Sequence, residues 1–517
     1  MNAVNQLGFP ILSLVVFLPA LGGLLLLAIR RPEQARVFAL AWSLIVFAVS
    51  LPLLISFQRE HVGIQYHEFF DWIPGWGIQY RLALDGISLW LVLLTTFMTP
   101  LAIWSAWKVD KKLNSFLMLI LLQETGMLGV FLAQDLFLFY IFWEFTLIPM
   151  YFMIGIWGGP RRIYATIKFF LYTFAASVFM LLGIIALGLL NYRYLSATNP
   201  QLVAEAFNLQ SITANMGQLG LSPVETKLLF LAFFIAFAVK VPIWPVHTWL
   251  PDAHVEAPTA GSVILAAVLL KMGAYGMIRF NVQLFPQVAA EWARPIAVLA
   301  IIGIIYGAWL AYAQTDIKKL VAYSSVSHMG FIVLGIFALN REGIAGSVLQ
   351  MVNHGLSTGA LFLLVGMVYE RQHTRELADY GGLWKVTPVF VFFLLFATMS
   401  SVGLPGLNGF IGEFTVMAGT FNSQLGWTFT AFAAIGVILA AVYLLKMFQG
   451  VASGPLDARK NGGLRDLTGR EVALLLPICA AILAIGLYSS YFFSAMDTTV
   501  RELVTFVTNN APTLAGR

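Results

Sequence analysis

The chain has 517 residues, of which 59% are hydrophobic and only 11% are charged, whereas a soluble domain carries about 25% charged residues. This composition excludes an ordinary soluble protein and predicts a polytopic membrane protein. The net charge of +5 does not indicate nucleic-acid binding, because no basic stripe is present, and the single cysteine, Cys479, excludes internal disulfides and a four-cysteine iron–sulfur cluster.

Apolar segments of about 20 residues recur along the chain, and a segment of this length spans a bilayer as a helix. The first, at 10–28, lacks a preceding positive region and is interpreted as a retained helix, not as a cleaved signal. We predict an all-α fold of about 14 transmembrane helices, centred near residues 20, 46, 95, 123, 145, 178, 237, 270, 304, 331, 356, 400, 438 and 482. The segments 58–81 and 191–226 are expected to form amphipathic or extramembrane structure. The last helix is expected to end near Phe493, with a short tail after it.

Positive charges are distributed unevenly between the predicted loops. Of the 30 Lys and Arg residues, 18 lie in the odd-numbered loops and 9 in the even-numbered loops and tails. Because cytoplasmic loops carry an excess of Lys and Arg, the odd loops are predicted to be cytoplasmic and both termini to lie outside. No transit peptide precedes the first helix, which favours a bacterial plasma membrane or an organelle-encoded chain.

Four ionisable side chains lie inside the predicted membrane helices: Glu144, Lys240, Lys271 and Glu413. A charge at the bilayer centre costs roughly 2.5–3.5 kcal/mol on insertion scales, so such residues indicate a proton or ion path by default. Glu144 beside Lys240 favours the protonated lysine, and withdrawing that carboxylate would release the proton. A paired carboxylate that only fixes helix contacts is the structural alternative for Glu144.

Two halves of the chain resemble each other. The stretch AAVLLKM at 266–272 recurs as AVYLLKM at 441–447, and AQD at 133–135 resembles AQTD at 313–316, at offsets near 175 to 180 residues. Five helices separate the copies, and an odd number inverts the second copy in the membrane, as in many secondary transporters. We therefore expect inverted repeats in helices 4 to 8 and 9 to 13. The expected divisions are 1–110, 111–280, 290–450 and 451–517.

Helices 7 and 12 are predicted to be broken at equivalent places. Pro242 and Pro245 follow Lys240, and are expected to free the carbonyls of Ala238 and Val241 as acceptors. The stretch SSVGLPGLNG at 400–409 breaks helix 12 just before Glu413. Packing alone can explain one such break, but two beside buried charges indicate function.

Several further polar residues have competing interpretations. His328 and His354 are predicted to relay protons, although a buried histidine is more often a hydrogen-bonded core residue. Tyr323 and Ser324 are candidates for holding bridging waters.

Lys271 is too far from either helix end to reach the interface, whereas Lys446 is near enough for its ammonium to do so. Asp135 is expected to cap helix 5. The polar stretch 247–258 is either a mouth for protons or a loop that packs on partner subunits.

Three motifs carry a resemblance to a known family: FWE at 142–144, KVPIWPVHTWLPDAH at 240–254 and GLPGLNGF at 403–410. With them, the chain resembles the antiporter-like membrane subunits of proton-pumping NADH:quinone oxidoreductase, respiratory complex I. Glu413 at the helix 12 break resembles chain M of that family, since its two sister subunits usually have lysine there.

The resemblance implies a membrane-arm subunit that translocates protons while quinone is reduced elsewhere. Glu144 and Lys240 would form a switching pair, Lys271 a central relay, His328 and His354 a connection, and Glu413 the outlet. The chain itself would carry no cofactor. NADH, FMN, iron–sulfur clusters and quinone would belong to other subunits, and the two sister antiporter-like subunits would be its main partners in the bilayer.

Three alternative functions remain open from the sequence. Subunits of multisubunit sodium/proton antiporters resemble the same family, and a membrane scaffold without transport would tolerate neutral residues at the buried charges. A quinone-reducing enzyme is the weakest alternative because no cofactor-binding motif is apparent.

Overall fold

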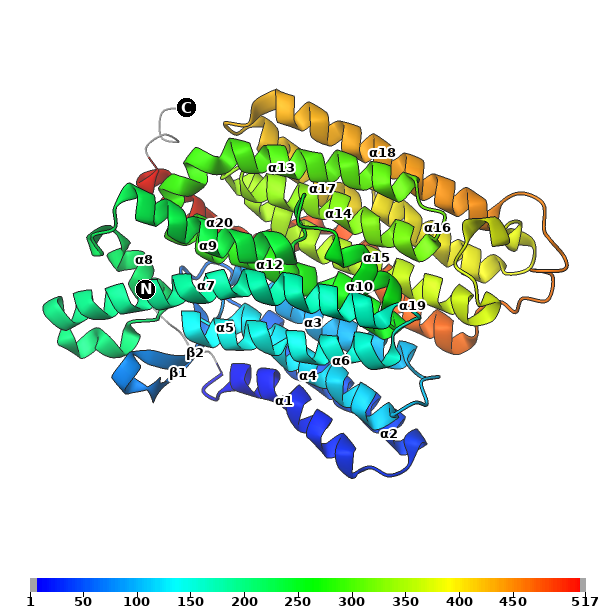
Figure 1. Cartoon of the computed structure of the whole chain (residues 1–517), viewed down its shortest axis with the longest axis horizontal. Helices are drawn as coiled ribbons and strands as arrows, with labels where there is room; N and C mark the ends of the chain where they lie inside the picture. Colours follow the sequence, from blue (N-terminus) through cyan, green and yellow to red (C-terminus); the bar gives the residue numbers. More distant parts are fainter. Residues whose placement is uncertain (1–6, 512–517) are drawn as a thin grey trace.

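Each of the fourteen predicted segments is helical in the computed structural model, which describes residues 7–511 (Figure 1). Twelve helical stretches are long and apolar enough to cross a membrane. The other two predicted spans contain α9 and α16, and each of these helices ends at a predicted break. The predicted all-α membrane fold is confirmed, and the count of fourteen spans stays a prediction.

The first half of the chain contains the helices up to residue 282. They are α1 (Ile11–Leu25), α2 (Pro32–Ile55), α3 (Gly86–Ser105), α4 (Leu113–Leu132), α5 (Leu136–Phe145), α6 (Leu147–Trp157), α7 (Arg162–Thr198), α8 (Leu209–Asn215), α9 (Pro223–Lys240), α10 (Trp249–Glu256), α11 (Thr259–Ile264) and α12 (Leu270–Gly276). Wider π-helical turns at Leu265–Leu269 and Met277–Val282 make α11 and α12 parts of one continuous span.

The second half contains the remaining helices. They are α13 (Pro286–Tyr312), α14 (Ile317–Ile336), α15 (Arg341–Gln372), α16 (Pro388–Val402), α17 (Asn408–Phe421), α18 (Gly426–Ala452), α19 (Gly469–Leu487) and α20 (Ser489–Asn510). Helices α3, α12, α14 and α15 are almost wholly buried by the others, so side chains on them lie in the interior of the bundle.

Both predicted breaks are present. Helix α9 ends at Lys240 and α10 begins at Trp249, whereas α16 ends before Gly403 and α17 begins at Asn408. Gly403 has φ +85°, a left-handed conformation that glycine adopts without strain. The prediction of a free carbonyl at Ala238 is wrong, because this oxygen accepts a hydrogen bond from Ile243 N at 2.8 Å. A hydrogen bond between residues five apart replaces the bond between residues four apart that Pro242 cannot donate.

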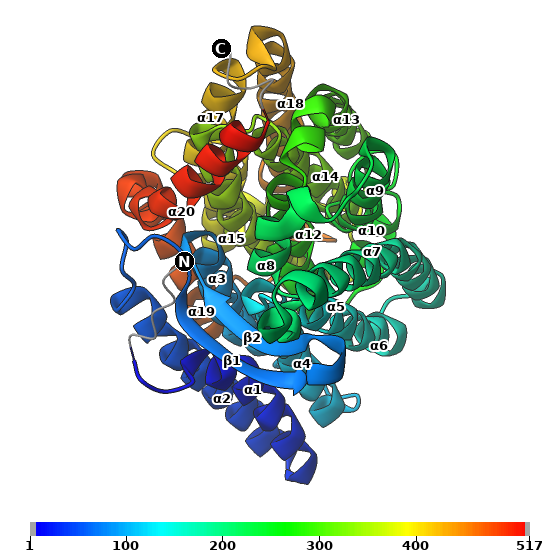
Figure 2. The same cartoon turned by 90° about the vertical axis from the view of Figure 1, so that its left-hand side faces the viewer.

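An antiparallel hairpin of β1 (Gln65–Ile73) and β2 (Ile78–Leu84) covers one end of the bundle, here called the hairpin end (Figure 2). The segment 200–218 packs beside it, and backbone bonds join both to the start of α5: Gln134 N donates to Arg81 O, and Leu136 N donates to Phe207 O, each at 2.9 Å. The segments 58–81 and 191–226, which were expected to be amphipathic or extramembrane, therefore pack together at the hairpin end. Helix α7 extends further into this region than predicted, to Thr198.

The expected short tail after Phe493 is wrong, because α20 runs from Ser489 to Asn510. Its buried residues are Ala495, Met496, Val500, Leu503 and Val507. They follow helical spacing, so one stripe faces the bundle and polar residues face away. The mean hydropathy of this segment is too low for a span, so the sequence did not predict a helix there. Helix α20 lies across the hairpin end (Figure 2).

The two AQD-type junctions cap helices at opposite ends of the bundle. Asp135 accepts from Phe137 N and Leu138 N at the start of α5, beside the hairpin. Asp316 accepts from Lys318 N and Lys319 N at the start of α14, beside Arg375 of the loop after α15. The predicted cap at Asp135 is confirmed. The opposite ends of the two caps agree with inverted halves, whose boundaries stay a prediction.

Candidate functional site

The break after α9 places Lys240 in the interior. Lys240 is 1% exposed, and its Nζ has no hydrogen-bond partner among the described residues. The ammonium lies 5.2 Å from the centroid of the Trp143 ring and 5.9 Å from that of Phe169. Both rings can stabilise a desolvated cation through their π-faces. The Lys240 ammonium is therefore cut off from water, and the two rings offset part of the cost of burying its charge.

Glu144 lies at the end of α5, near enough to Lys240 for the two groups to interact electrostatically. They form no salt bridge within the described part of the chain, and Glu144 Oε1 has no hydrogen-bond partner there. The predicted pair is thus two neighbouring groups with Trp143 beside the ammonium, so a small movement of either changes their interaction strongly.

Lys271 lies at the centre of the bundle and is 0% exposed. Its Nζ donates to Ala266 O in the π-helical turn and lies 2.7 Å from Nδ1 of His354 on α15. A π-helical turn displaces one carbonyl from the α-helical ladder, and such turns are frequent at functional sites. The turn before Lys271 provides an acceptor for the ammonium that a regular helix would not offer.

His354 continues to a second histidine and a glutamate. The rings of His354 and His328 have centroids 5.8 Å apart, and His328 Nδ1 lies 2.7 Å from Glu413 Oε1. The four predicted residues from α12, α15, α14 and α17 therefore form one line: Lys271, His354, His328 and Glu413. Every member is at most 3% exposed. Such a line can exchange protons between neighbours because imidazole both donates and accepts.

Amide and hydroxyl groups hold the far end of this line. Gln350 Nε2 donates to Glu413 Oε1 at 3.1 Å, and the Tyr443 hydroxyl lies 3.3 Å from His328 Nε2. Asn353 Nδ2 donates to Asn408 O at 2.7 Å, which ties α15 to the first turn of α17 after the break. The break thus brings Glu413 against α15 at a fixed distance from His328.

Three other polar residues, Tyr323, Ser324 and Lys446, lie outside this line. Ser324 is buried and donates to Val321 O, whereas Tyr323 is half-buried. Lys446 is exposed near the end of α18 and donates to Tyr312 O at 2.9 Å. The stretch 247–258 is not an open loop, since α10 within it is largely buried against α7 and α14.

The comparisons with known proteins agree with this architecture. The sequence pattern of a family described as NADH:quinone oxidoreductase/Mrp antiporter, transmembrane, matches residues 133–440. A Rhodobacter capsulatus protein named NADH-quinone oxidoreductase subunit M is 45% identical over 503 residues, covering 96% of each chain. The chain belongs to the NADH:quinone oxidoreductase/Mrp antiporter family. The predicted resemblance is therefore confirmed.

Solved structures in this family have the same fold. A chain of respiratory complex I from Thermus thermophilus with bound NADH has a TM-score of 0.85 at 32% identity, covering 96% of this chain and 99% of that one. A chain of the Mrp complex from a Dietzia species has a TM-score of 0.80 at 20% identity, covering 97% and 55%. The second likeness shows the fold alone. Together with the apolar helices, these matches make the chain a multi-pass membrane protein of this family.

Two further buried ionisable groups were not predicted from the sequence. Glu124 on α4 is 0% exposed, and neither carboxylate oxygen has a hydrogen-bond partner among the described residues. His254 on α10 is also 0% exposed, stacks on Phe362 at 4.7 Å between centroids, and lies near Lys271 and Lys318. Glu124 follows the same rule that singled out the other four, being a carboxylate inside an apolar helix. His254 was assigned to a loop, so its burial was not expected.

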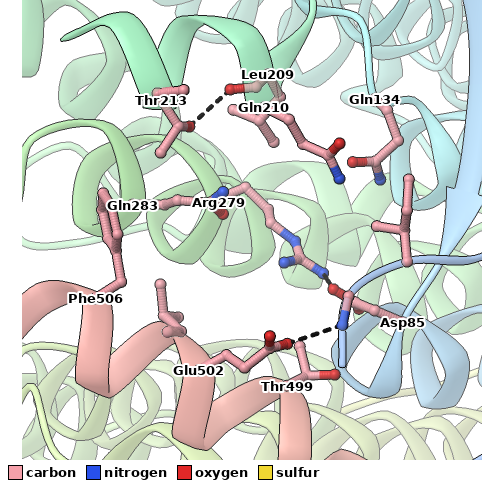
Figure 3. Close-up of a pocket in the computed structure, with 14 residues that line it drawn as sticks. Asp85, Gln134, Leu209, Gln210, Thr213, Arg279, Gln283, Thr499, Glu502 and Phe506 are labelled. Carbon is pink, nitrogen blue, oxygen red and sulfur yellow. Dashed lines mark hydrogen bonds and ion pairs between the residues drawn. The ribbon is translucent and has the colours of Figure 1, made fainter. Parts of the chain in front are cut away.

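A further missed group lies at the hairpin end. Arg279, counted as a loop residue from the sequence, is 7% exposed and forms an ion pair with Asp85, the N-cap of α3. Figure 3 shows Arg279 reaching across a cavity of about 330 Å³ towards Asp85. Glu502 of α20 also lines this cavity and accepts from Gly63 N at 3.0 Å; burial raises the pKa of its carboxyl. This cavity, lined by both apolar and charged side chains, lies between α20 and the interior.

No metal centre is indicated in residues 7–511, where no group of three or more His, Cys, Asp or Glu side chains is placed to hold an ion. The buried charges of the line are instead held by one another and by amides. The chemistry that this arrangement supports is proton exchange between fixed side chains.

Proposed function

We propose that this chain is a membrane subunit of an NADH:quinone oxidoreductase and moves protons across the membrane along its buried polar residues. The Rhodobacter relative is named as subunit M of such an enzyme, and the Thermus structure is a respiratory complex I. The observation that carries the proposal is the line from Lys271 to Glu413, in which each side chain lies next to the following one in an apolar interior.

Each residue has a role in this proposal. Glu144 and Lys240 form a switch in which movement of one charge changes the proton affinity of the other. Lys271 receives the proton, His354 and His328 pass it on, and Glu413 releases it towards the outside. His354 and His328 do this by turning a donor nitrogen into an acceptor and back. Lys240 and Lys271 are the two groups whose charge the protein must stabilise without a paired carboxylate in contact.

The energy comes from other subunits in this proposal. Moving one charge against 100 mV requires about 2.3 kcal/mol, and no redox group is expected on this chain. NADH, flavin, iron–sulfur clusters and quinone belong to the remainder of the complex. Two sister antiporter-like subunits are the nearest partners that we propose.

We also propose the orientation. The hairpin end carries the predicted outer loops, and the opposite end carries the Lys- and Arg-rich loops, including 373–387 and 453–468. The excess of positive charge favours the cytoplasm for the latter. Both termini then face outward from a bacterial plasma membrane, with the chain organised as 1–110, 111–280, 290–450 and 451–517.

Redox-driven proton uptake by inverted membrane vesicles tests the proposal. Lys271→Ala should abolish most of the uptake, because it removes the group that joins the π-helical turn to His354, while a native gel still shows an assembled complex. Lys385→Ala is the matched control, since Lys385 is an exposed lysine of the cytoplasmic loop. Normal uptake per electron in an assembled Lys271→Ala complex would contradict the proposal.

A sodium/proton antiporter subunit is the second candidate, because the family includes Mrp antiporters. The same vesicles distinguish the two functions. Uptake that follows NADH oxidation and is independent of sodium supports the oxidoreductase, whereas proton movement driven by a sodium gradient without NADH supports the antiporter.

A further inference from the structure

Helices α13 and α18 run side by side at the edge of the bundle (Figures 1 and 2). Between them lies a groove of about 450 Å³, whose walls include Ile301, Ile302, Ile305, Trp309, Phe429 and Phe432. Almost every atom on its surface is apolar, and Trp309 is 57% exposed. Both helices are long and apolar enough to cross the membrane, so the groove opens towards the hydrocarbon layer.

The groove continues towards a cation. A second hollow of about 220 Å³ shares Trp309 with the first and is also lined by Tyr312 and Val442. Lys446 follows Val442 by four residues, so the two side chains lie on one face of α18. Its ammonium lies 4.0 Å from the centroid of the Tyr312 ring, near the ends of α13 and α18. Two adjoining apolar hollows thus lie along the membrane, and a positive charge on the Tyr312 ring lies near the second.

Lys446 has unused hydrogen-bonding capacity. An ammonium carries three donors, and among the described residues only Tyr312 O is bonded to it, at 2.9 Å. Lys446 forms no ion pair with a carboxylate of residues 7–511. Tyr, Trp and Lys at a helix end are typical of the headgroup level of a bilayer. The free donors are complementary to the oxygens of a phosphate.

We propose that the α13–α18 groove binds an anionic phospholipid of the bilayer, with one acyl chain between Ile302 and Phe429 and the phosphate on Lys446. The volume of the groove falls in the range of specific ligand pockets, and basic pockets between membrane helices on the cytoplasmic side bind anionic headgroups. The lipid covers apolar surface that α13 and α18 leave open. It also fixes Lys446 at the interface, which explains a lysine at this place without a role in proton transfer.

A photo-cross-linking residue in the intact, detergent-washed complex tests occupancy. Placed at Ile302, it should attach to retained phospholipid, detected as a mass shift of the α13 peptide. Placed at Leu182, an exposed residue of the apolar helix α7 that lines neither of these hollows, it should attach to little or no lipid after washing. Attachment at Ile302 to another polypeptide, or equal lipid attachment at both places, would overturn the proposal.

The headgroup is tested by reconstituting the same complexes with equal phosphatidylglycerol and phosphatidylcholine. One lysine near a membrane surface favours an anionic lipid by about five-fold, which is the expected ratio of the two cross-linked lipids at Ile302. Lys446→Gln should bring the ratio near unity, whereas the exposed control Lys385→Gln should leave it unchanged. A ratio that Lys446→Gln does not alter would overturn the assignment of the phosphate to Lys446. Native gels verify assembly of each variant.

Discussion

The two broken spans solve the problem of a buried charge in different ways. At the first break, two aromatic rings lie near the Lys240 ammonium, which has no hydrogen-bond partner within residues 7–511, and Glu144 is near but not bonded to it. At the second break, Glu413 is bonded to His328 and Gln350 in one closed cluster. The ammonium of the first site lies beside the Trp143 ring, whereas the carboxylate of the second is held by hydrogen bonds.

The difference suggests a division of work between the halves. An unbonded charge responds strongly to the position of a neighbouring charge, because the interaction varies with distance in a medium of low dielectric constant. A bonded carboxylate and imidazole can exchange a proton without moving. The first half is therefore suited to sensing a change in charge, and the second half to transferring the proton.

Removing the proton-binding group of the closed cluster should give the largest effect. Glu413→Gln retains a side chain that can bond His328 but cannot take up a proton. Because a positioned acid or base typically contributes about 100-fold or more to proton transfer, we expect nearly complete loss of redox-driven proton uptake in inverted vesicles.

Gln350→Leu is the matched variant for that experiment. It removes one hydrogen bond to the same carboxylate and leaves the proton-binding group in place. We expect a partial decrease in uptake. If both variants lost uptake equally, the cluster would matter for packing and not for the proton held by Glu413.

Changing the ring beside Lys240 should give a smaller effect. Trp143→Leu removes the π-face beside Lys240, and a desolvated cation–π contact is worth about 2 kcal/mol. We expect a several-fold slower uptake in the same vesicles, with an intermediate rate for Trp143→Phe, which keeps an aromatic face. Equal rates for Leu and Phe would show that volume, and not the π-face, is what Lys240 requires.

The sequence predicted the membrane helices because apolar length is a local property. It also predicted the breaks, since proline and glycine act on their own backbone, and four members of the line, since a charge in an apolar helix is conspicuous. The order of the line did not follow from the sequence alone. It depends on the packing of α12, α14, α15 and α17, which brings Lys271 and His354 together over 83 residues.

The misses have two physical causes. Arg279 was overlooked because it lies near a predicted span boundary, where a charge looks ordinary until burial is known, whereas Glu124 lies near the centre of a predicted span, between Gln123 and Thr125. Helix α20 was missed because it is amphipathic and has too low a hydropathy for a span. The free carbonyl at Ala238 was predicted from regular helix geometry, which the chain abandons at the break.

The caps of the two halves provide a comparison at the level of stability. Asp135 and Asp316 each accept two backbone N–H groups of the helix that they cap, and replacing an N-cap by alanine typically costs about 1 kcal/mol. We expect Asp135→Ala and Asp316→Ala to lower the melting temperature of the purified complex slightly. Asn caps as well as Asp, so Asp135→Asn and Asp316→Asn should lose less. Each Asn variant should still lose some stability, because the second oxygen of Asp135 accepts from Gln79 N at 3.1 Å and that of Asp316 pairs with Arg375 at 3.2 Å. No loss in Asp316→Asn would remove Arg375 from this account.

The smallest effect is expected in the β1–β2 hairpin, where a hydrogen bond from Arg81 requires His67 to be neutral. Arg81 Nε donates to His67 Nε2 at 2.8 Å, so this nitrogen must carry a lone pair. Burial, with the charge of Arg81, lowers the pKa of His67 from 6.5 to about 4. A group whose pKa is depressed on folding favours the folded state while it stays neutral, and this contribution is lost as the pH falls from 6.5 through about 4.

Hydrogen exchange of the amides of β1 and β2 should therefore show less protection at pH 5 than at pH 7.5, after correction for the intrinsic exchange rate. In His67→Gln, whose amide oxygen can accept the same bond at every pH, the difference should disappear. The loop 373–387 at the opposite end serves as an internal reference, because the lowered pKa of the partly exposed Asp379 carboxyl beside Lys460 keeps that pair charged at both pH values. Loss of protection in both places at pH 5 would point to general loosening, and the specific role of His67 would then be wrong.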